Sequence, residues 1–284
     1  MQDGLPTVRG VLSAADLAVV NLETAVTERG ERAAKQYAYR TPPSTLVALR
    51  DAGVDVVTLA NNHGMDYGVQ GVRDTVAAAE QVGLPAVGIG LDEDRAYAPH
   101  VADVRGTRVA VIGATQVLDA AFLESWVAGP DKPGLASARR TERLVAEVQD
   151  ARTQADVVVV YLHWGRELDP CPLPRQQELA RALVDAGADV VVGAHAHVPL
   201  GGGYLDGAYV DYGLGNFIWN TKGGEGARSG VLTLTLEGRT VTASDWAPAA
   251  IVDGVPYLLE GERAAAERAD KQSRRACTDL SAQP

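Results

Sequence analysis

Three short apolar runs, each rich in valine and each followed by histidine, constrain the fold of this chain more than any other feature. They are residues 54–60 followed by Asn61-Asn62-His63, residues 156–160 followed by His163, and residues 189–192 followed by His195-Ala196-His197. Runs that are β-branched and nearly free of polar residues are typical of buried parallel strands. Because ligand sites in open α/β sheets lie just beyond the carboxyl ends of the strands, we expect these side chains to converge.

Convergent histidines predict a metal site, since imidazole is the commonest metal ligand in proteins. His195 and His197 are alternate residues, so both would face one side if the strand continued to that point. A fourth run, residues 17–20, leads into Glu23 and adds a carboxylate at the same level. A single histidine at a strand end is more often structural, and His100, which precedes another strand, is interpreted in that way.

Composition and charge bound the possible functions. The 284-residue chain is 46% hydrophobic, enough for one large α/β domain over residues 1–284 or for two small ones. One domain is favoured, because we find no linker and no internal repeat. The formal net charge of −11, from 26 basic and 37 acidic residues, argues against a nucleic-acid-binding surface. An anionic substrate remains compatible with that charge, since bound cations invert the local field.

Membrane and disulfide signals are weak in this sequence. The apolar runs are too short for a transmembrane helix, and residues 1–6 contain no signal-peptide core. We therefore expect a cytoplasmic chain, unless a signal or anchor lies upstream. Two cysteines, Cys171 and Cys277, are too few for a disulfide framework, and Cys171 is interpreted as a loop thiol.

Strands alternate with helical patterns over most of the chain, which indicates a largely parallel sheet covered by helices. The predicted helices are residues 42–52, 69–82, 141–151 and 174–186. After His197 the polarity alternates and predicts antiparallel strands at residues 209–212, 231–236 and 241–246. Residues 261–284 are predicted as a C-terminal helix and tail, with the helix over 261–277 and disorder from Ala276.

Five segments in this order resemble the CapA family of capsule synthesis, associated with poly-γ-glutamate, which looks like a branch of the calcineurin-like metallophosphoesterases. They are Asn21-Leu22-Glu23, Ala60-Asn61-Asn62-His63 with Asp66 and Gly68, His163-Trp164-Gly165 with Glu167, Gly193-Ala194-His195-Ala196-His197, and Leu214-Gly215-Asn216-Phe217. The resemblance implies an α/β fold of four layers, an α/β/β/α sandwich with two sheets face to face and helices outside.

The resemblance also implies roles for individual residues. Glu23 falls where a carboxylate bridges two metals, and His197 falls on a ligand of the second metal. The ligands of the first metal would be Asn62, His163 and His195. His63 falls in the place of the general acid, and Asp66 is expected to fix its loop or to orient it. The metal would be a divalent ion such as Mn, Fe, Zn or Mg.

One departure from the family pattern changes the expected metal content. The family opens with an additional strand ending in Gly-Asp, and here only residues 1–10 precede the region that begins at Val11. Asp3 is the sole candidate carboxylate there. Glu23 alone supplies one negative charge for two divalent cations, so we expect one firm metal site and a second that is weak or absent.

The leading hypothesis is a metal-dependent hydrolase of phosphoester type, with an anionic small molecule, a peptide or polyglutamate as substrate. The expected pocket residues are Trp164, Arg166, Glu167 and Asn216. Arg166 would clamp the anion, although Arg166 and Glu167 also fit a solvated ion pair at a strand end. Two rivals are a non-hydrolytic accessory subunit of polymer synthesis or export, and a metal-independent peptide epimerase with His63 as base. The sequence specifies no oligomeric state.

Overall fold

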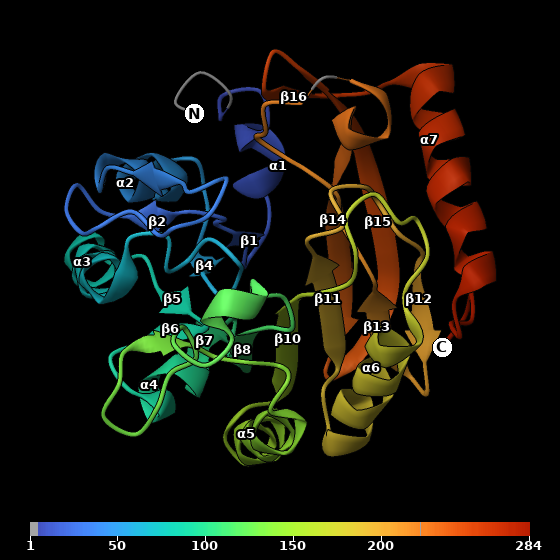
Figure 1. Ribbon diagram of the computed structural model, residues 1–284. Helices are drawn as coiled ribbons and strands as arrows, with labels where there is room; N and C mark the ends of the chain where they lie inside the picture. Colours follow the sequence, from blue (N-terminus) through green and yellow to red (C-terminus); the bar gives the residue numbers. More distant parts are fainter. Residues whose placement is uncertain (1–4, 222) are drawn as a thin grey trace.

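A computed structural model describes residues 5–221 and 223–284, and its centre is a six-stranded mixed sheet (Figure 1). Asp3 lies outside the described residues. The strand order is β12-β13-β11-β10-β8-β7, and neighbours among β13, β11, β10 and β8 are parallel, whereas the two edge strands are antiparallel. Their bounds are β7 His100–Val104, β8 Thr107–Thr115, β10 Val157–His163, β11 Val190–Ala194, β12 Gly202–Leu205 and β13 Ala208–Asp211.

Two three-stranded sheets lie on one face of this six-stranded sheet. The first is parallel and contains β1 Val19–Asn21, β4 Val56–Thr58 and β5 Ala86–Val87, with β1 at its edge. The second is antiparallel and contains β14 Arg228–Glu237, β15 Thr240–Val252 and β16 Val255–Leu258. Two smaller pairs are β2 Ala25–Val26 with β3 Arg40–Thr41, and β6 Ile89–Gly90 with β9 Gly134–Leu135.

Helices cover the outer surfaces of these sheets (Figure 1). Apolar residues of α4 Glu93–Tyr97, α5 Thr141–Gln154 and α6 Pro174–Ala186 form one cluster with the six-stranded sheet. Residues of α2 Ser44–Asp51 and α3 Gly68–Val82 cover β4 from the other side. The short helices are α1 Arg9–Leu12, η1 Ala120–Phe122, η2 Gly224–Ala227 and η3 Arg274–Cys277, and α7 Gly261–Ser273 runs along β15.

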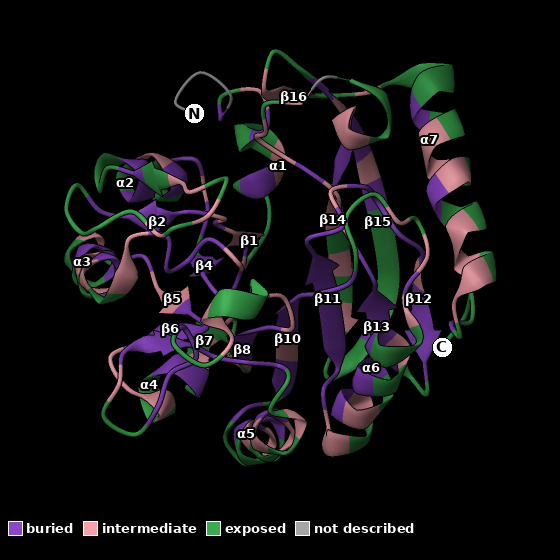
Figure 2. Cartoon of the chain, viewed as in Figure 1, coloured by how far each residue is buried: buried purple, intermediate pink, exposed green. Residues whose placement is uncertain are grey.

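Alternation along β10 shows how the layers meet and where its last residue points. Val158, Val160 and Leu162 pack toward the helices. Val159 and Tyr161 pack toward the two smaller sheets. Side chains two residues apart share a face, so His163 belongs to the face of Val159 and Tyr161. The sequence pattern thus directs this histidine between the sheets, and Figure 2 shows the neighbouring strand β11 buried throughout.

The sequence predicted helix limits best where proline or glycine marks them. The interval 174–186 is confirmed, with Pro174 opening α6 and Gly187 following it at a left-handed φ of 112°. The expected antiparallel strand at 209–212 is wrong in part. It is β13, which runs parallel to β11 and antiparallel only to β12. A short alternating run does not indicate that its strand has one parallel and one antiparallel neighbour in the sheet.

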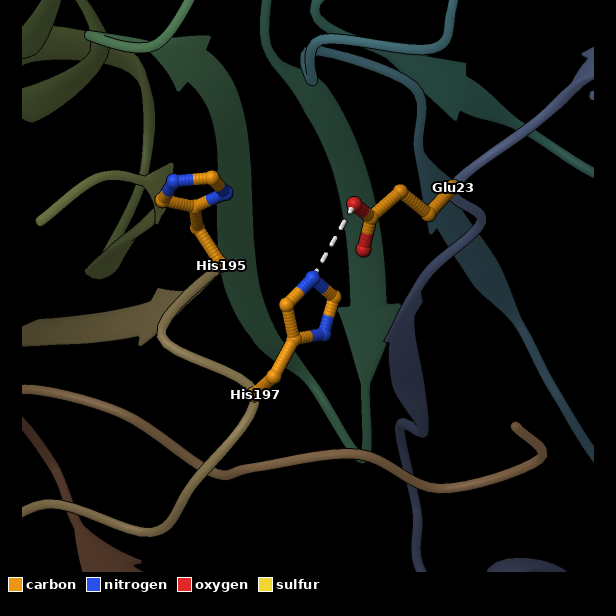
Figure 3. A group of neighbouring side chains, drawn as sticks. All are labelled: Glu23, His195 and His197. Atoms are coloured by element: carbon orange, nitrogen blue, oxygen red, sulfur yellow. Dashed lines mark ion pairs between the residues drawn. The ribbon is translucent and has the colours of Figure 1, made fainter. Parts of the chain in front are cut away.

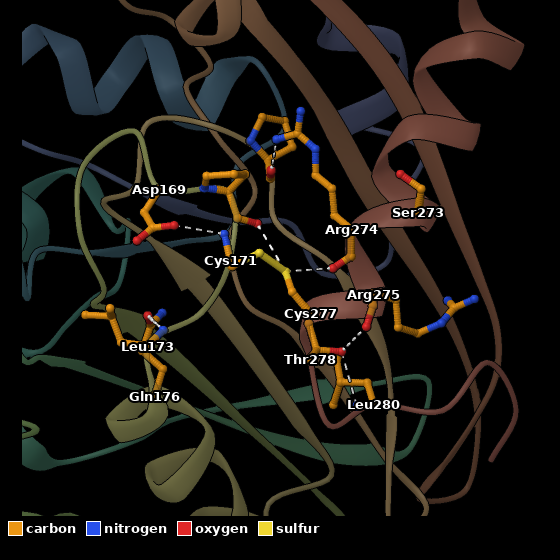
Figure 4. Close-up of a disulfide and its surroundings, with 12 residues drawn as sticks. Asp169, Cys171, Leu173, Gln176, Ser273, Arg274, Arg275, Cys277, Thr278 and Leu280 are labelled. Carbon is orange, nitrogen blue, oxygen red and sulfur yellow. Dashed lines mark hydrogen bonds between the residues drawn. A yellow bond between two sulfur atoms is a disulfide. The ribbon is translucent and has the colours of Figure 1, made fainter.

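The C-terminal segment is more firmly held than the sequence indicated. Cys171 and Cys277 form a disulfide across a separation of 106 residues, so the prediction of a loop thiol is wrong (Figure 4). The predicted disorder from Ala276 is also wrong, because Ser281 and Tyr204 of β12 exchange backbone hydrogen bonds of 2.9 Å. The physical reason for both errors is tertiary, since η3 brings Cys277 beside the loop that precedes α6. Among the described residues, no helix is both long and apolar enough to cross a bilayer.

Candidate metal centre

The end of β10 and the loops that follow β1, β4 and β11 bring the predicted ligands together at the carboxyl ends of these strands. Ligand atoms of Glu23, His195 and His197 all lie within 4.8 Å of one another (Figure 3). His163 Nε2 is 3.6 Å from Glu23 Oε1 and 2.9 Å from Asn62 Oδ1. The geometry therefore gathers a carboxylate, an amide oxygen and three imidazoles, all of which are ligand types for divalent transition metals.

Three buried atoms in this cluster have no hydrogen-bond partner among the described residues: Glu23 Oε1, His163 Nδ1 and His195 Nδ1. An unpartnered buried polar atom costs free energy, and such atoms call for a group that accepts their lone pairs. A divalent cation would do so for the carboxylate, and for an imidazole nitrogen of each histidine. The residues present therefore fit a metal ion.

Electrostatics in the cluster follow from burial. Burial raises the pKa of Glu23 to about 8, against a smaller opposing effect of the hydrogen bond from Asn21. Burial first, and neighbouring imidazoles second, lower the pKa of His195 to about 3 and that of His163 well below its usual value. Both imidazoles are thus neutral at physiological pH, which is the form that binds metal.

His195 and His197 reach the centre by a route that differs from the sequence prediction. Strand β11 ends at Ala194, and both histidines have left-handed backbone conformations, with φ of 94° and 57°. The argument from strand alternation is therefore wrong, although the two side chains do share one site. Positive φ at non-glycine residues is costly and clusters at functional sites.

Asn216 orients His197 and has no free side-chain atom for a substrate in this structure. His197 Nδ1 lies 2.6 Å from Asn216 Oδ1, so with the proton on Nδ1 the imidazole donates to the amide. Asn216 Nδ2 donates to the carbonyls of His197 and Gly226, at 3.2 and 2.9 Å. This arrangement leaves His197 Nε2 directed toward Glu23 Oε1, 4.0 Å away. Such outer hydrogen bonds fix the tautomer of a ligating histidine.

Two asparagines that the sequence analysis did not single out hold the loops of the centre. Asn61 Nδ2 donates to Asn21 Oδ1 and to the carbonyl of Leu22, both at 3.0 Å, and Asn61 Oδ1 accepts from the backbone of His63. Asn21 Nδ2 donates to Glu23 Oε2 at 3.3 Å. A signal was present, because Asn21 ends β1 and Asn61 follows the parallel neighbour of that strand, β4.

The pair of His63 and Asp66 lies beside the ligand cluster. Both residues are buried, and His63 Nδ1 is 2.6 Å from Asp66 Oδ2. The ring of Tyr39 packs on His63, with centroids 4.3 Å apart, and meets Trp219 edge-on. Trp219 in turn stacks on His197 at 4.9 Å. These two aromatic residues, also missed from the sequence, join the imidazoles of His63 and His197 along one side of the site.

The expected pocket residues differ in where the structure places them. The prediction for Trp164 is wrong, because this residue is fully buried and its indole donates to the carbonyl of Tyr212. It packs over Gly193, where a Cβ would lie 2.2 Å from the indole nitrogen. Arg166 forms an exposed ion pair with Asp169. This arrangement resembles the solvated ion pair considered as the alternative role of Arg166, except that the partner is Asp169 and not Glu167. Glu167 is exposed, and its charge acts on both Glu23 and His197.

Comparison with known proteins assigns the family. The family model for the bacterial capsule synthesis protein PGA_cap matches residues 1–221. This chain belongs to the PGA_cap family. Its PGA_cap segment contains the five motifs described above, and His163, His195, His197, Glu23 and Asn62 all fall inside the match.

Curated relatives of this PGA_cap chain are longer than it is. It is 36% identical over 216 residues to the PGA biosynthesis protein CapA of Bacillus subtilis, covering 75% of this chain and 56% of that protein. The capsule biosynthesis protein CapA of Bacillus anthracis is 34% identical over 230 residues, with coverages of 80% and 55%. The chain thus spans little more than half the length of these relatives.

One further sequence relative and one solved structure are similar to this chain. A probable polyglutamine synthesis accessory protein of Mycobacterium tuberculosis is 33% identical over 237 residues, covering 81% of this chain and 62% of that one. The crystal structure of a hypothetical protein from Thermus thermophilus has a TM-score of 0.53 at 22% identity, over 91% of this chain and 92% of that one. At this identity the second likeness shows a common mixed α/β fold and no more.

Proposed function

We propose that this PGA_cap chain is a metal-dependent hydrolase of phosphoester type that acts on an anionic substrate. The observation that carries the proposal is the convergence of Glu23, His195 and His197 on one point. The buried unpartnered atoms of Glu23, His195 and His163 are explained if a cation is the missing partner.

The packing of the sheets supports the four-layer α/β/β/α interpretation. Apolar clusters fill the space between the six-stranded sheet and the two three-stranded sheets, and helices cover the outside. Strand β1 lies at an edge of its sheet, which is where that interpretation expects the family's additional strand. A ligand site between two sheets at strand ends also agrees with the position of Glu23 and His163.

A divalent cation, when bound, would supply Lewis acidity that polarises a phosphoryl oxygen. Glu23 would provide the negative charge of the site, and His163, His195 and His197 would be neutral donors. His63 would protonate the leaving oxygen, while Asp66 holds its imidazole. Because Glu23 is the one carboxylate in the His/Glu group found among the described residues, we propose a single firm metal site and a weak or absent second one.

The substrate class follows from charge and from the relatives. A cation held by one carboxylate keeps a net positive charge, which favours phosphate or carboxylate groups over neutral ones. Relatives named for PGA and capsule biosynthesis make polyglutamate or a precursor peptide the candidate of first interest.

The disulfide bears on where this activity takes place. Disulfides persist in oxidising compartments and are rare in a reducing cytosol. We therefore propose that this domain works in an oxidising compartment, in place of the cytoplasmic location expected from the sequence. Mass spectrometry of alkylated protein taken directly from cells would test this. Free thiols at Cys171 and Cys277 would contradict it.

Elemental analysis and a hydrolysis assay test the main proposal together. The purified chain should contain a divalent transition metal and should hydrolyse bis(p-nitrophenyl) phosphate when supplied with Mn²⁺. Glu23→Gln should abolish both properties, while Glu28→Gln, an exposed carboxylate on a loop, should change neither. A chain that binds no metal and gives no metal-dependent hydrolysis contradicts the proposal.

A second candidate function is that of a non-catalytic accessory subunit of polymer synthesis. The observation that favours it is the similarity to the probable accessory protein of Mycobacterium tuberculosis. Polymer production in cells that carry Glu23→Gln separates the two. Normal production with no hydrolysis supports the accessory role, and loss of production supports the hydrolase.

A further inference from the structure

A buried lysine, Lys35, contacts the pair of His63 and Asp66 through the carboxylate of Asp66. The side chain of Lys35 is only 10% exposed, although it lies in the loop between β2 and β3. Its Nζ donates to the carbonyl oxygen of Asn62 at 2.6 Å and lies 3.1 Å from Asp66 Oδ1. A buried ammonium costs much free energy unless it is paired, so these contacts are the reason that it can stay there.

Asp66 depends on this ammonium. The carboxylate is completely buried, and its Oδ2 accepts from His63 Nδ1 and from the backbone N–H of Tyr39, each at 2.6 Å. Its Oδ1 accepts no hydrogen bond of good geometry among the described residues. Lys35 is therefore the charge that balances this oxygen. Removing one partner of a buried ion pair leaves the other uncompensated.

Lys35 also links its own loop to the loop after β4 and to the segment around η1. It is 3.1 Å from Asp119 Oδ2 and lies 5.1 Å from the centroid of the Trp126 ring. The backbone N–H of Ala33 donates to the carbonyl of Asp66 at 2.8 Å. The segment that carries Lys35 and Tyr39 thus encloses the loop after β4, which contains both the amide ligand Asn62 and His63.

We propose that Lys35 is a positioning residue for the proton-transfer pair: by holding the carboxylate of Asp66 in place, it fixes the imidazole of His63 with its Nε2 side free to face the reacting group. This inference rests on the proposed hydrolase function and assigns a further residue to it. Lys35 does not touch the substrate, and it acts through Asp66 and through the backbone of Asn62.

The proton balance of the step is simple. The His63 imidazolium gives its Nε2 proton to the oxygen of the leaving group as the phosphorus–oxygen bond breaks. The Nδ1 proton stays in its hydrogen bond to Asp66, so a neutral imidazole remains, and water reprotonates it. The carboxylate accepts the hydrogen bond from Nδ1 and so orients the imidazole for the transfer. Lys35 holds that carboxylate in place through its contact with Oδ1, 3.1 Å away.

Dependence on the leaving group separates this role from a structural one. We compare Lys35→Met with Lys35→Arg, using bis(p-nitrophenyl) phosphate and an alkyl phosphodiester as substrates. General acid catalysis is worth about 10²–10⁴-fold, and it matters most when the departing alkoxide is strongly basic. Lys35→Met should therefore lose at least about tenfold in kcat on the alkyl ester, with a much smaller loss on the nitrophenyl ester. Lys35→Arg should restore most of the loss, and metal content should not change.

Two controls test whether the effect of Lys35→Met is specific to this site and acts through His63. Lys132→Met is the same substitution at a lysine that bonds a surface-loop carbonyl of Glu124, and it should leave both rates unchanged. In a His63→Ala background, Lys35→Met should cause no further loss, because residues that act as one unit are not additive. Equal losses on the two esters, or an additive loss in that background, would overturn the inference.

A measurement without turnover keeps the test independent of the proposed function. In the metal-free chain, NMR should show a downfield His63 Nδ1 proton, which should disappear or move upfield in Lys35→Met and persist in Lys132→Met. Its persistence in Lys35→Met overturns the inference even if hydrolysis is present. If the wild-type chain shows no hydrolysis, the hydrolase proposal fails while this signal still decides the role of Lys35. Should Lys35→Met not fold, Lys35→Gln removes the charge, retains a donor and takes its place.

Discussion

The two sides of the site satisfy their polar atoms in different ways. On the ligand side, Glu23, His163 and His195 each keep a buried atom without a partner among the described residues. On the dyad side, Asp66 Oδ1 also accepts no hydrogen bond among these residues, but it forms an ion pair with Lys35, and Asp66 Oδ2 pairs with His63. The ligand side thus has atoms that a cation could bind, whereas the protein itself pairs the dyad side. Metal binding and proton transfer should therefore be separable by mutation.

The largest expected effect comes from the dyad side. His63→Ala should retain metal and lose turnover of the alkyl phosphodiester by about 10²–10⁴-fold, since it removes the proposed general acid and no proposed ligand. Elemental analysis and steady-state rates on one preparation measure both. His100→Ala, which alters a half-buried histidine on β7, is the matched control. Turnover that survives in His63→Ala would remove the distinction between the two sides.

A second test compares two histidines within the ligand side. His195→Ala should lower metal content more than His197→Ala, because the family resemblance assigns His195, with Asn62 and His163, to the fuller ligand set. Titration calorimetry of the unaltered chain should give close to one metal ion per chain. Equal metal loss in the two variants argues against an asymmetric centre, and tight binding of two ions would require a further carboxylate.

Removing the hydrogen bond that orients His197 should have a smaller effect. Asn216→Leu deletes the acceptor at His197 Nδ1, and such outer-sphere changes typically cost about 10–100-fold in metal affinity. Asn216→Asp keeps the acceptor oxygen and should bind metal more tightly than the leucine variant. The NMR signal of His63 should be the same in both, and a change there would show that the two sides are coupled.

The smallest expected effect is a pH dependence of the metal-free chain. The pKa of Glu23 is about 8 in the folded protein, above its ordinary value of 4.5. A raised folded-state pKa means that the folded chain retains a proton that the unfolded chain has lost. Stability should therefore fall as pH rises from about 7 to 8, a window above the ordinary histidine pKa, by about 1 kcal/mol.

Thermal unfolding of chelator-treated protein across this window measures the effect. Bound metal should reverse its sign, because metal competes with the proton on Glu23 and affinity then rises with pH. Glu23→Gln should abolish the dependence. A flat profile in the metal-free protein would show that Glu23 is already paired, and the ligand side would then not need a cation.

Local patterns predicted the parts of the fold that depend on neighbours in sequence. Pro174 and Gly187 delimit α6, and the valine runs became β4, β10 and β11 because β-branched side chains suit strands buried on both faces. The strand ends also indicated the ligand set, since parallel strands place their carboxyl ends together. That reasoning failed at His195 and His197, where a turn with positive φ replaces the strand.

Contacts between distant segments lay beyond any local pattern. The pairing of Cys171 with Cys277 spans 106 residues, and neither cysteine has a neighbour in sequence that indicates its partner. Trp164 follows a predicted ligand, yet it turns into the core because Gly193 on the adjacent strand leaves room for its indole. Tyr39 reaches His63, and Lys35 reaches its partner Asp66, from a loop that shows no periodicity.

By itself, the sequence determined which residue types arrive at the strand ends, because hydrophobic periodicity fixes strands and faces, and strand ends are where polar side chains can gather. Only the tertiary structure decided which of these atoms are buried without partners and which are paired. Burial and pairing depend on the distance between loops, and that distance is set by the packing of whole sheets. The unpartnered oxygen of Glu23 and the balance of Asp66 by Lys35 both arise at that level.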